Sequence, residues 1–210
     1  MRVRLNKPGL VVISFALLTV ASVAYAAARD FAVTNQGGSR IQFVSDAPLE
    51  TITGVSSNVT GTVHIDPANL AGATGRVAVR VDSIRTGIDL RDEHLRSDTW
   101  LNAARFPEAA FVLTRIEGAT SLSPNQTANV TLHGRFTIHG VTRETTAQAQ
   151  LRYVPVTDQM RTNHITGDAL RVQANFRIRM SDYGVSIPSV VQLKVANELE
   201  VNVTLRATAP

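Results

Sequence analysis

Two stretches of strictly alternating apolar and polar residues limit most strongly what this chain can fold into. The first covers residues 170–180 and the second residues 198–206. A period of two is typical of strands that bury one face and expose the other. Eleven residues span about 36 Å at about 3.3 Å per residue, so each strand needs a long apolar surface to pack against. The apolar positions of the first stretch are Leu170, Val172, Ala174, Phe176, Ile178 and Met180.

The same rhythm recurs in shorter segments along the chain, separated by turn-forming residues at 66–69, 123–125 and 163–168. About eight to ten strands follow, and because no helix alternates with them, the sheet should be antiparallel. The apolar face of such long strands is buried either between two packed sheets or inside a closed barrel. Few aromatic residues fall on the apolar positions, which are mostly Val, Ala and Ile. This favours an eight-stranded barrel whose lumen suits one slender apolar ligand, although a packed sandwich fits the same residues.

One segment, residues 89–104, breaks the alternation and is rich in helix-forming residues. Acidic side chains near its start favour a helix, because the helix dipole places positive potential there. Phe106 precedes a proline, and this position disfavours helical geometry. We therefore expect one short helical insertion near residues 89–104 in an otherwise all-β domain.

The first 26 residues have the three-part pattern of a secretory signal peptide. A basic start is followed by an uncharged apolar core at 10–23, and Ala24 and Ala26 supply the small residues of a cleavage site. The apolar core is shorter than the roughly 20 residues that a membrane-spanning helix needs, which argues against a stable anchor. We expect a signal peptide at 1–26, a single barrel domain at 27–210, and a periplasmic or secreted protein.

Composition excludes several functional classes. The chain has no cysteine, so a disulfide framework, a thiolate metal site and a cysteine nucleophile are excluded. Without residues 1–26, the 21 basic residues fall to 18 against 17 acidic ones, and this balance argues against nucleic-acid binding. No nucleophile elbow, phosphate loop, zinc-protease helix or calcium loop is found. We expect no catalytic residue, no metal and no cofactor.

Charged residues cluster at the start of the expected helix. We expect Arg91, Asp92 and Arg96 to form a local ion-pair network that fixes the helix against the barrel mouth. An alternative is an isomerase or hydrolase in which Asp92 and His94 act as acid and base. His133 and His139 lie on a tight hairpin in the sequence, and we interpret them as surface or turn residues rather than metal ligands.

Three blocks of the sequence resemble the signature of the YceI-like family. They are the Ser83–Gly87, Arg91–Ser97 and Phe106–Phe111 run, the stretch Gly134–Arg143, and the turn Arg179–Gly184. The ordered resemblance extends from about Ile41 to Leu205. It implies a lipocalin-like, eight-stranded antiparallel barrel that is exported and holds an extended isoprenoid chain, such as a polyprenyl or quinone tail.

The resemblance and the alternation together give the expected ligand site. Arg91, His94 and Arg96 are expected at the mouth, where they either meet a polar headgroup or only fix the helix. A continuous lumen suits a long chain, whereas a lumen plugged by Trp100 or Phe136 suits a short one. The expected lumen residues are Phe43, Val79, Val81, Trp100, Phe106, Phe111, Phe136, Phe176, Ile178 and Val201.

Two other functions stay open at this point. The first is binding of other hydrophobic small molecules, such as fatty acids or lipophilic toxicants. The second is a structural β-module without a ligand, which predicts a solid core. A homodimer is compatible with the sequence as well.

Overall fold

The computed structural model describes residues 28–35, 38–164 and 166–209, and the predicted signal peptide lies outside them. Ten strands and several short helices follow one another along this part of the chain. Their bounds are β1 Arg29–Val33, β2 Arg40–Asp46, β3 Thr51–Ser56, β4 Val59–Asp66, β5 Asn69–Arg80, η1 Val81–Ser83, α1 Asp89–Arg96, β6 Glu108–Glu117, β7 Thr127–Ile138, β8 Val141–Val154, α2 Asp158–Thr162, β9 Ala169–Arg179, η2 Met180–Tyr183, η3 Ser189–Val191 and β10 Glu198–Thr208.

The ten strands form one antiparallel sheet that closes on itself as an eight-stranded barrel. The order is β1-β4-β5-β6-β7-β8-β9-β10, and β1 also pairs with β10 to close the ring. β2 pairs with the first part of β10, and β1 pairs with Ala207 and Thr208 near the end of β10. β1 and β2 therefore lie one after the other along the same edge of β10. β3 pairs with β2, as β4 pairs with β1. The predicted eight-stranded antiparallel barrel is therefore confirmed, and the sandwich alternative is wrong.

The alternating stretches face as predicted. Five apolar positions of β9, from Leu170 to Ile178, and Met180 at the start of η2 are buried or half-buried, whereas the arginines and amides between them are exposed. β10 shows the same pattern, and its register against β9 is continuous from Glu198 to Thr208. Because every strand contributes its apolar face to the inside, the core is the barrel interior.

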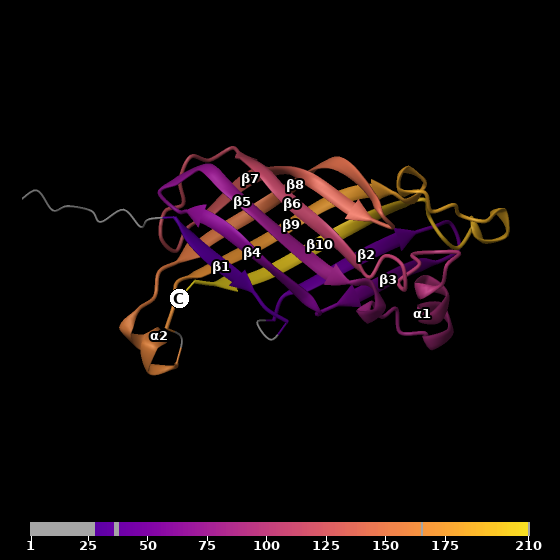
Figure 1. Ribbon diagram of the computed structural model, residues 1–210, viewed down its shortest axis with the longest axis horizontal. Coiled ribbons are helices and arrows are strands. Elements are labelled where there is room, and N and C mark those ends of the chain that lie inside the picture. The colour runs from indigo at the N-terminus through magenta and orange to yellow at the C-terminus, as the bar shows by residue number, and fades with distance from the viewer. Residues whose placement is uncertain (1–27, 36–37, 165, 210) are drawn as a thin grey trace, which may run out of the picture.

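The two ends of the barrel differ in what covers them (Figure 1). At one end lie α2, the start of β1 and the end of β10. At the other end lie α1 and the hairpin between β2 and β3. We call these the closed end and the mouth. None of the helices among the described residues has the length and apolar character required to cross a bilayer.

The helical insertion is shorter than predicted. α1 covers Asp89–Arg96, and residues 97–105 form turns rather than the rest of a helix. The Ser97 hydroxyl donates to the carbonyl of His94 at 2.7 Å, so a side chain takes the place of the next helical bond. A second short helix, α2, stands next to the segment that was predicted as a turn.

Candidate functional site: an apolar tunnel and its mouth

The barrel interior contains a cavity of about 470 Å³ that is lined almost entirely by apolar side chains. This volume lies in the range of about 300–1,000 Å³ that is typical of small-molecule sites. A structural β-module without a ligand predicts a solid core, and the cavity contradicts that prediction. The barrel is therefore built to hold a hydrophobic ligand.

The lining of the cavity includes residues along the whole of β9, and we call this cavity the tunnel. The five inward residues of β9 from Leu170 to Ile178 line it, and so does Met180 at the start of η2. Ten residue steps along a strand span about 33 Å at about 3.3 Å per residue. Leu170 and Leu205 lie toward the closed end, whereas Ile187 and Lys194 belong to the chain that connects β9 to β10 at the mouth. One continuous space thus joins the two, which is the form that an extended chain requires.

Three aromatic rings from β6, β7 and β9 lie together on the lining of the tunnel. Phe136 packs edge-on against Phe176 with ring centroids 5.2 Å apart, and Phe111 lies 6.2 Å from Phe176. Phe111 covers Gly134 on the neighbouring strand, where a β-carbon would collide with the ring. Phe43 covers Gly54 on β3 in the same way. These glycines give the Phe111 and Phe43 rings space to lie against the wall. Phe136 lies on the lining of the same cavity, and whether it limits the length of a ligand stays a prediction.

The structure places most of the predicted lumen residues on the tunnel wall. Trp100 is among them, and it is half-buried, in the turns that follow α1. Whether these side chains touch a ligand stays a prediction. The residues on the wall are Phe43, Val79, Trp100, Phe111, Phe136, Phe176, Ile178 and Val201.

Two predicted lumen residues lie elsewhere. Val81 continues the alternation of β5 in the sequence, but the strand ends at Arg80 and the chain turns into η1, which buries Val81 away from the tunnel. Phe106 packs against the β7–β8 turn, with its ring 4.9 Å from His139 and in contact with Gly140. The lumen assignment is therefore wrong for both residues.

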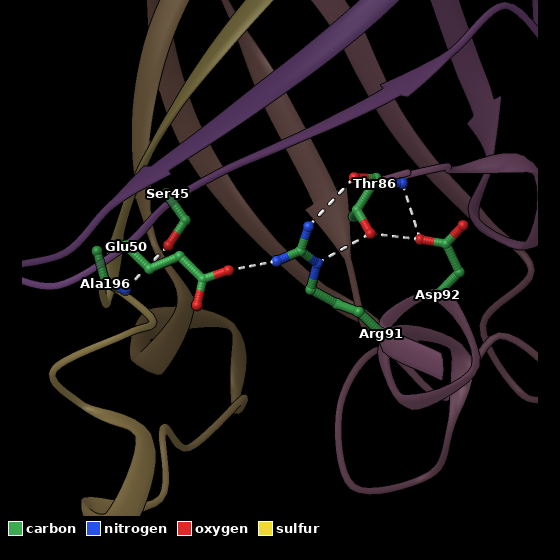
Figure 2. Close-up of polar contacts among 6 residues, drawn as sticks. All are labelled: Ser45, Glu50, Thr86, Arg91, Asp92 and Ala196. Atoms are coloured by element: carbon green, nitrogen blue, oxygen red, sulfur yellow. Dashed lines mark hydrogen bonds and ion pairs between the residues drawn. The ribbon is translucent and has the colours of Figure 1, made fainter. Parts of the chain in front are cut away.

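A chain of hydrogen bonds at the mouth fixes α1 to the barrel (Figure 2). Thr86 is its centre: its hydroxyl donates to Asp92 at 2.6 Å and accepts from Nε of Arg91 at 3.0 Å, and its backbone N–H also donates to Asp92. The other guanidinium nitrogens of Arg91 donate to the Thr86 carbonyl and to the Glu50 carboxylate, the latter at 2.6 Å. Arg91 thus joins α1 to the β2–β3 hairpin.

Asp92 is almost fully buried below this network. Burial by itself would raise its pKa, but the hydrogen bonds from Thr86 and the charges of Arg85 and Arg96 outweigh it and lower the pKa below the ordinary value. Asp92 is therefore an anion whose role is to hold the 86–92 turn. A carboxylate in this state is poorly suited to take up a proton as a catalytic base.

The predicted ion-pair network is correct in its location and wrong in its partners. Arg91 pairs with Glu50 rather than with Asp92, and Asp92 accepts from Thr86. Arg96 ends α1, and among the described residues it neither lines the tunnel nor pairs with Asp92. His94 is exposed and lines the mouth without a hydrogen bond to Asp92 within the described chain. The acid–base alternative therefore has no paired geometry to support it.

The mouth also contains residues that the sequence did not single out. Lys194 lines the tunnel opening and is the only lysine after residue 7. The segment around it is held by two contacts: the N–H of Ala196 donates to the Ser45 hydroxyl at 2.9 Å (Figure 2), and that of Leu49 donates to the Leu193 carbonyl. The sequence around Lys194 shows no periodicity from which its position at the tunnel opening could be predicted. The one available signal is that no other lysine follows residue 7.

His133 and His139 contact different partners. His133 contacts Glu117 at 2.8 Å on the outer surface, whereas Nδ1 of His139 lies 3.1 Å from the carbonyl of Tyr183. Among the residues that the structure describes, no three His, Asp or Glu side chains are grouped as metal ligands. Both histidines are thus surface or turn residues, as predicted.

Comparison with known families agrees with this geometry. The YceI-like domain matches residues 33–207, which is most of the chain. A UPF0312 protein from Shewanella denitrificans is 30% identical over 124 residues, covering 58% of this chain and 62% of that protein. Protein YceI from Salmonella newport is 31% identical over 112 residues, covering 53% of each. The matches thus span about six-tenths or less of these relatives' length.

Solved structures show the same fold. The crystal structure of BcnA from Burkholderia cenocepacia gives a TM-score of 0.65 at 20% identity, covering 84% of this chain and 99% of that one. A polyisoprenoid binding domain from Saccharophagus degradans, implicated in plant cell wall breakdown, also gives 0.65 at 18% identity, covering 88% and 100%. At these identities the likeness concerns the fold alone.

Proposed function

Because this chain belongs to the YceI-like family, we propose that its tunnel holds the extended isoprenoid tail of a lipid, such as a polyprenyl chain or a quinone tail, for transport, storage or sequestration. The protein acts as a binding protein rather than an enzyme. The name of the Saccharophagus degradans domain, a polyisoprenoid binding domain of the same fold, supports this ligand class.

The observation that carries the proposal is the separation of polar and apolar lining. The ionisable side chains on the lining are Glu50, Arg91, His94 and Lys194, and all of them lie at the mouth. From there to Leu170 the wall is formed by aliphatic and aromatic groups. Such a site orients an amphiphile with its tail inside and its head at the opening. Arg91 has its donors engaged by Glu50 and Thr86, so the Lys194 ammonium and the His94 ring are the groups left to meet a polar head.

The energetics favour a long tail. Each CH₂ group removed from water contributes about 0.8 kcal/mol before the costs of ordering the chain are subtracted. Ten such groups therefore contribute roughly 8 kcal/mol without any hydrogen bond. A dry tunnel is sufficient for affinity, and its length determines which tails fit.

A chain-length series tests the proposal. We expect the affinity of delipidated protein for prenyl alcohols to rise with each isoprene unit and to level off once the tail fills the tunnel. Competition against a fluorescent prenyl probe measures this, and fatty acids in the same assay test the alternative ligand class. Equal or weaker binding of every prenyl alcohol relative to fatty acids of similar length would reject the isoprenoid assignment.

A tunnel-blocking variant provides the structural control. Ala174 lies midway along β9 on the tunnel wall, whereas its neighbour Gln173 is exposed on the outer face. Ala174→Phe should abolish binding of long tails and keep part of the binding of short ones. Gln173→Phe adds the same ring to the same strand from outside and should leave binding unchanged. Thermal melting of both variants verifies that they fold.

We also propose that the protein acts outside the cytoplasm, in the periplasm or as a secreted protein. The motivating feature is the signal-peptide pattern at 1–26, which lies outside the described residues. Cell fractionation followed by N-terminal sequencing should recover a chain that starts at Ala27. Recovery of the intact N-terminus from the cytoplasm would overturn this part of the proposal.

A further inference from the structure

The large aliphatic side chains that the described residues expose are all found at the mouth. Val190 is 90% exposed and Leu49 67%, and the other three are more than half exposed. They belong to three segments that surround the tunnel opening, residues 46–50, 86–96 and 187–194, which we call the rim. The five side chains are Leu49, Ile88, Leu90, Val190 and Leu193.

The rim is continuous with the tunnel. Ile88 and Leu90 are both exposed and part of the tunnel lining, and Val191 lines the tunnel next to Val190. The segments also contact one another, since Leu49 donates a backbone hydrogen bond to Leu193 and Arg91 pairs with Glu50. Apolar side chains therefore lead from the interior of the barrel to its outermost loops, beside the ionisable side chains of the mouth. Exposed apolar surface of this kind marks a contact site.

The charge of the rim limits the kind of surface that it can bind. Its three segments carry five acidic residues, Asp46, Glu50, Asp89, Asp92 and Glu93, against the three basic residues Arg91, Arg96 and Lys194. Attraction to a strongly anionic surface needs an excess of basic residues. The rim instead combines aliphatic side chains with a slightly negative charge, which suits an apolar surface without net charge.

We propose that the rim docks on an uncharged region of a lipid bilayer, with its five aliphatic side chains inserted among the lipids and the tunnel opening toward the acyl chains. This inference rests on the proposed function, because an isoprenoid tail is dissolved in a bilayer and crosses water only at high cost. Docking of the rim lets the tail pass from lipid to tunnel without exposure. A second copy of the chain placed mouth to mouth would instead seal both tunnels.

Vesicle binding by the empty protein tests the docking directly. The processed chain that starts at Ala27, delipidated, should float with phosphatidylcholine vesicles. Binding should persist from about 0.1 M to about 1 M NaCl, because an apolar contact is not screened by salt. The double variant Val190→Ser/Leu193→Ser should lower vesicle binding at least about ten-fold. Its two side chains are largely exposed, so folding should be unaffected. Met160→Ser, in α2 at the opposite end, is the control and should bind as the unchanged chain does.

Lys194 gives a local readout of the docked orientation. It lies on the rim and is the only lysine in the described residues. Acetylation of its amine, located by mass spectrometry, should slow several-fold when phosphatidylcholine vesicles are added. The same vesicles should not protect Lys194 in the double variant. Equal labelling with and without vesicles would show that the rim does not face the lipid.

The remaining outcomes separate this inference from the proposed function. The unchanged chain and the double variant Val190→Ser/Leu193→Ser should bind a prenyl probe delivered from ethanol equally well. Only the unchanged chain should take the probe up rapidly from vesicles. If neither binds the probe, the proposed function fails although docking stands on vesicle binding alone. Binding that requires anionic lipid or disappears in salt overturns the proposal. So does a dimer, seen by analytical ultracentrifugation, that the double variant dissociates.

Discussion

The closed end and the mouth of the barrel differ in how deeply their apolar side chains are buried and in what holds their segments together. At the closed end Phe31, Ile65 and Leu70 are almost completely buried, and Phe31 packs edge-on against Tyr153. At the mouth large aliphatic side chains face outward, and the segments are joined by a few side-chain contacts such as that between Arg91 and Glu50. The closed end is thus a packed core, whereas the mouth is an opening held in shape by polar contacts.

The closed end also contains the most completely satisfied buried carboxylate. Asp168 accepts from Arg29 at 2.6 Å, from the Tyr153 hydroxyl at 2.5 Å and from the backbone N–H of Val156 at 2.8 Å. Its own carbonyl accepts from Ala209, so the group ties β1, β8, β9 and the end of the chain together. Buried polar contacts thus join several strands at the closed end, whereas the mouth contains the tunnel opening, through which the proposed ligand would enter.

Removal of the Asp168 carboxylate should have the largest effect. Asp168→Ala leaves the buried Tyr153 hydroxyl and the Arg29 charge without their partner, so we expect the free energy of unfolding to fall by about 3 kcal/mol. Urea unfolding measures this. Asp158→Ala removes a fully exposed carboxylate from the nearby α2 and should stay within about 0.5 kcal/mol. Equal losses in the two variants would show that the closed end does not hold the barrel.

The same group gives the stability a pH dependence. Burial and the hydrogen bond to Asp168 raise the pKa of Tyr153 to about 12. Because the folded pKa lies above the unfolded value of about 10, its contribution is complete below pH ~10 and is lost as the pH rises toward about 12. Melting temperatures between these limits should fall less steeply for Tyr153→Phe than for the unchanged chain. Parallel curves would mean that Tyr153 is not protected by folding.

At low pH the stability depends on pH in the opposite direction, through Asp168. Burial alone would raise the pKa of Asp168, but hydrogen bonds from Tyr153 and Val156 and the charge of Arg29 lower it below its ordinary value. Its contribution is therefore complete above the unfolded pKa of about 3.9 and is lost as the pH falls through the lower folded value.

The sequence predicted the wall of the barrel better than its ends. The inward faces of β9 and β10 are correct because apolar and polar residues alternate without exception there. Val81 continues the alternation of β5, but alternation between apolar and polar residues does not indicate where a strand ends. Phe106 is an aromatic residue outside any alternating run, so its direction depended on the fold of the β7–β8 turn.

The ends depend on contacts between distant residues, which local patterns do not contain. Arg91 and Glu50 are 41 residues apart, and Arg29 and Asp168 are 139 apart. The exposed residues Val190 and Leu193 lie in a segment without periodicity, so neither their exposure nor their place on the rim was predictable. The family resemblance predicted the barrel, which is confirmed, and the isoprenoid ligand, which stays a proposal, whereas the rim emerged only from the structure.

At the mouth, Thr86→Val should alter ligand exchange more than stability. The change removes the hydroxyl that bridges Asp92 and Arg91 while it preserves the shape of the side chain. We expect a loss of about 1–2 kcal/mol in unfolding free energy, and a clearly faster dissociation of a prenyl probe because α1 is less firmly fixed. Stopped-flow release of the probe measures the rate. Thr99→Val, in the turns after α1, is the control; an equal change there would mean that any loosened turn speeds release.

The smallest effect is expected inside the tunnel, where a glycine determines the position of a ring. The β-carbon of Gly54→Ala would overlap the Phe43 ring that now covers the glycine, and the nearest atoms all belong to that flexible side chain. The ring must therefore move into the tunnel, and we expect affinity for long prenyl tails to fall about three-fold. The second change Phe43→Leu in the same chain should restore it by shortening the side chain. A loss that persists in the double variant would show that Gly54 is needed by the backbone of β3, and that the width of the tunnel is not controlled at this pair.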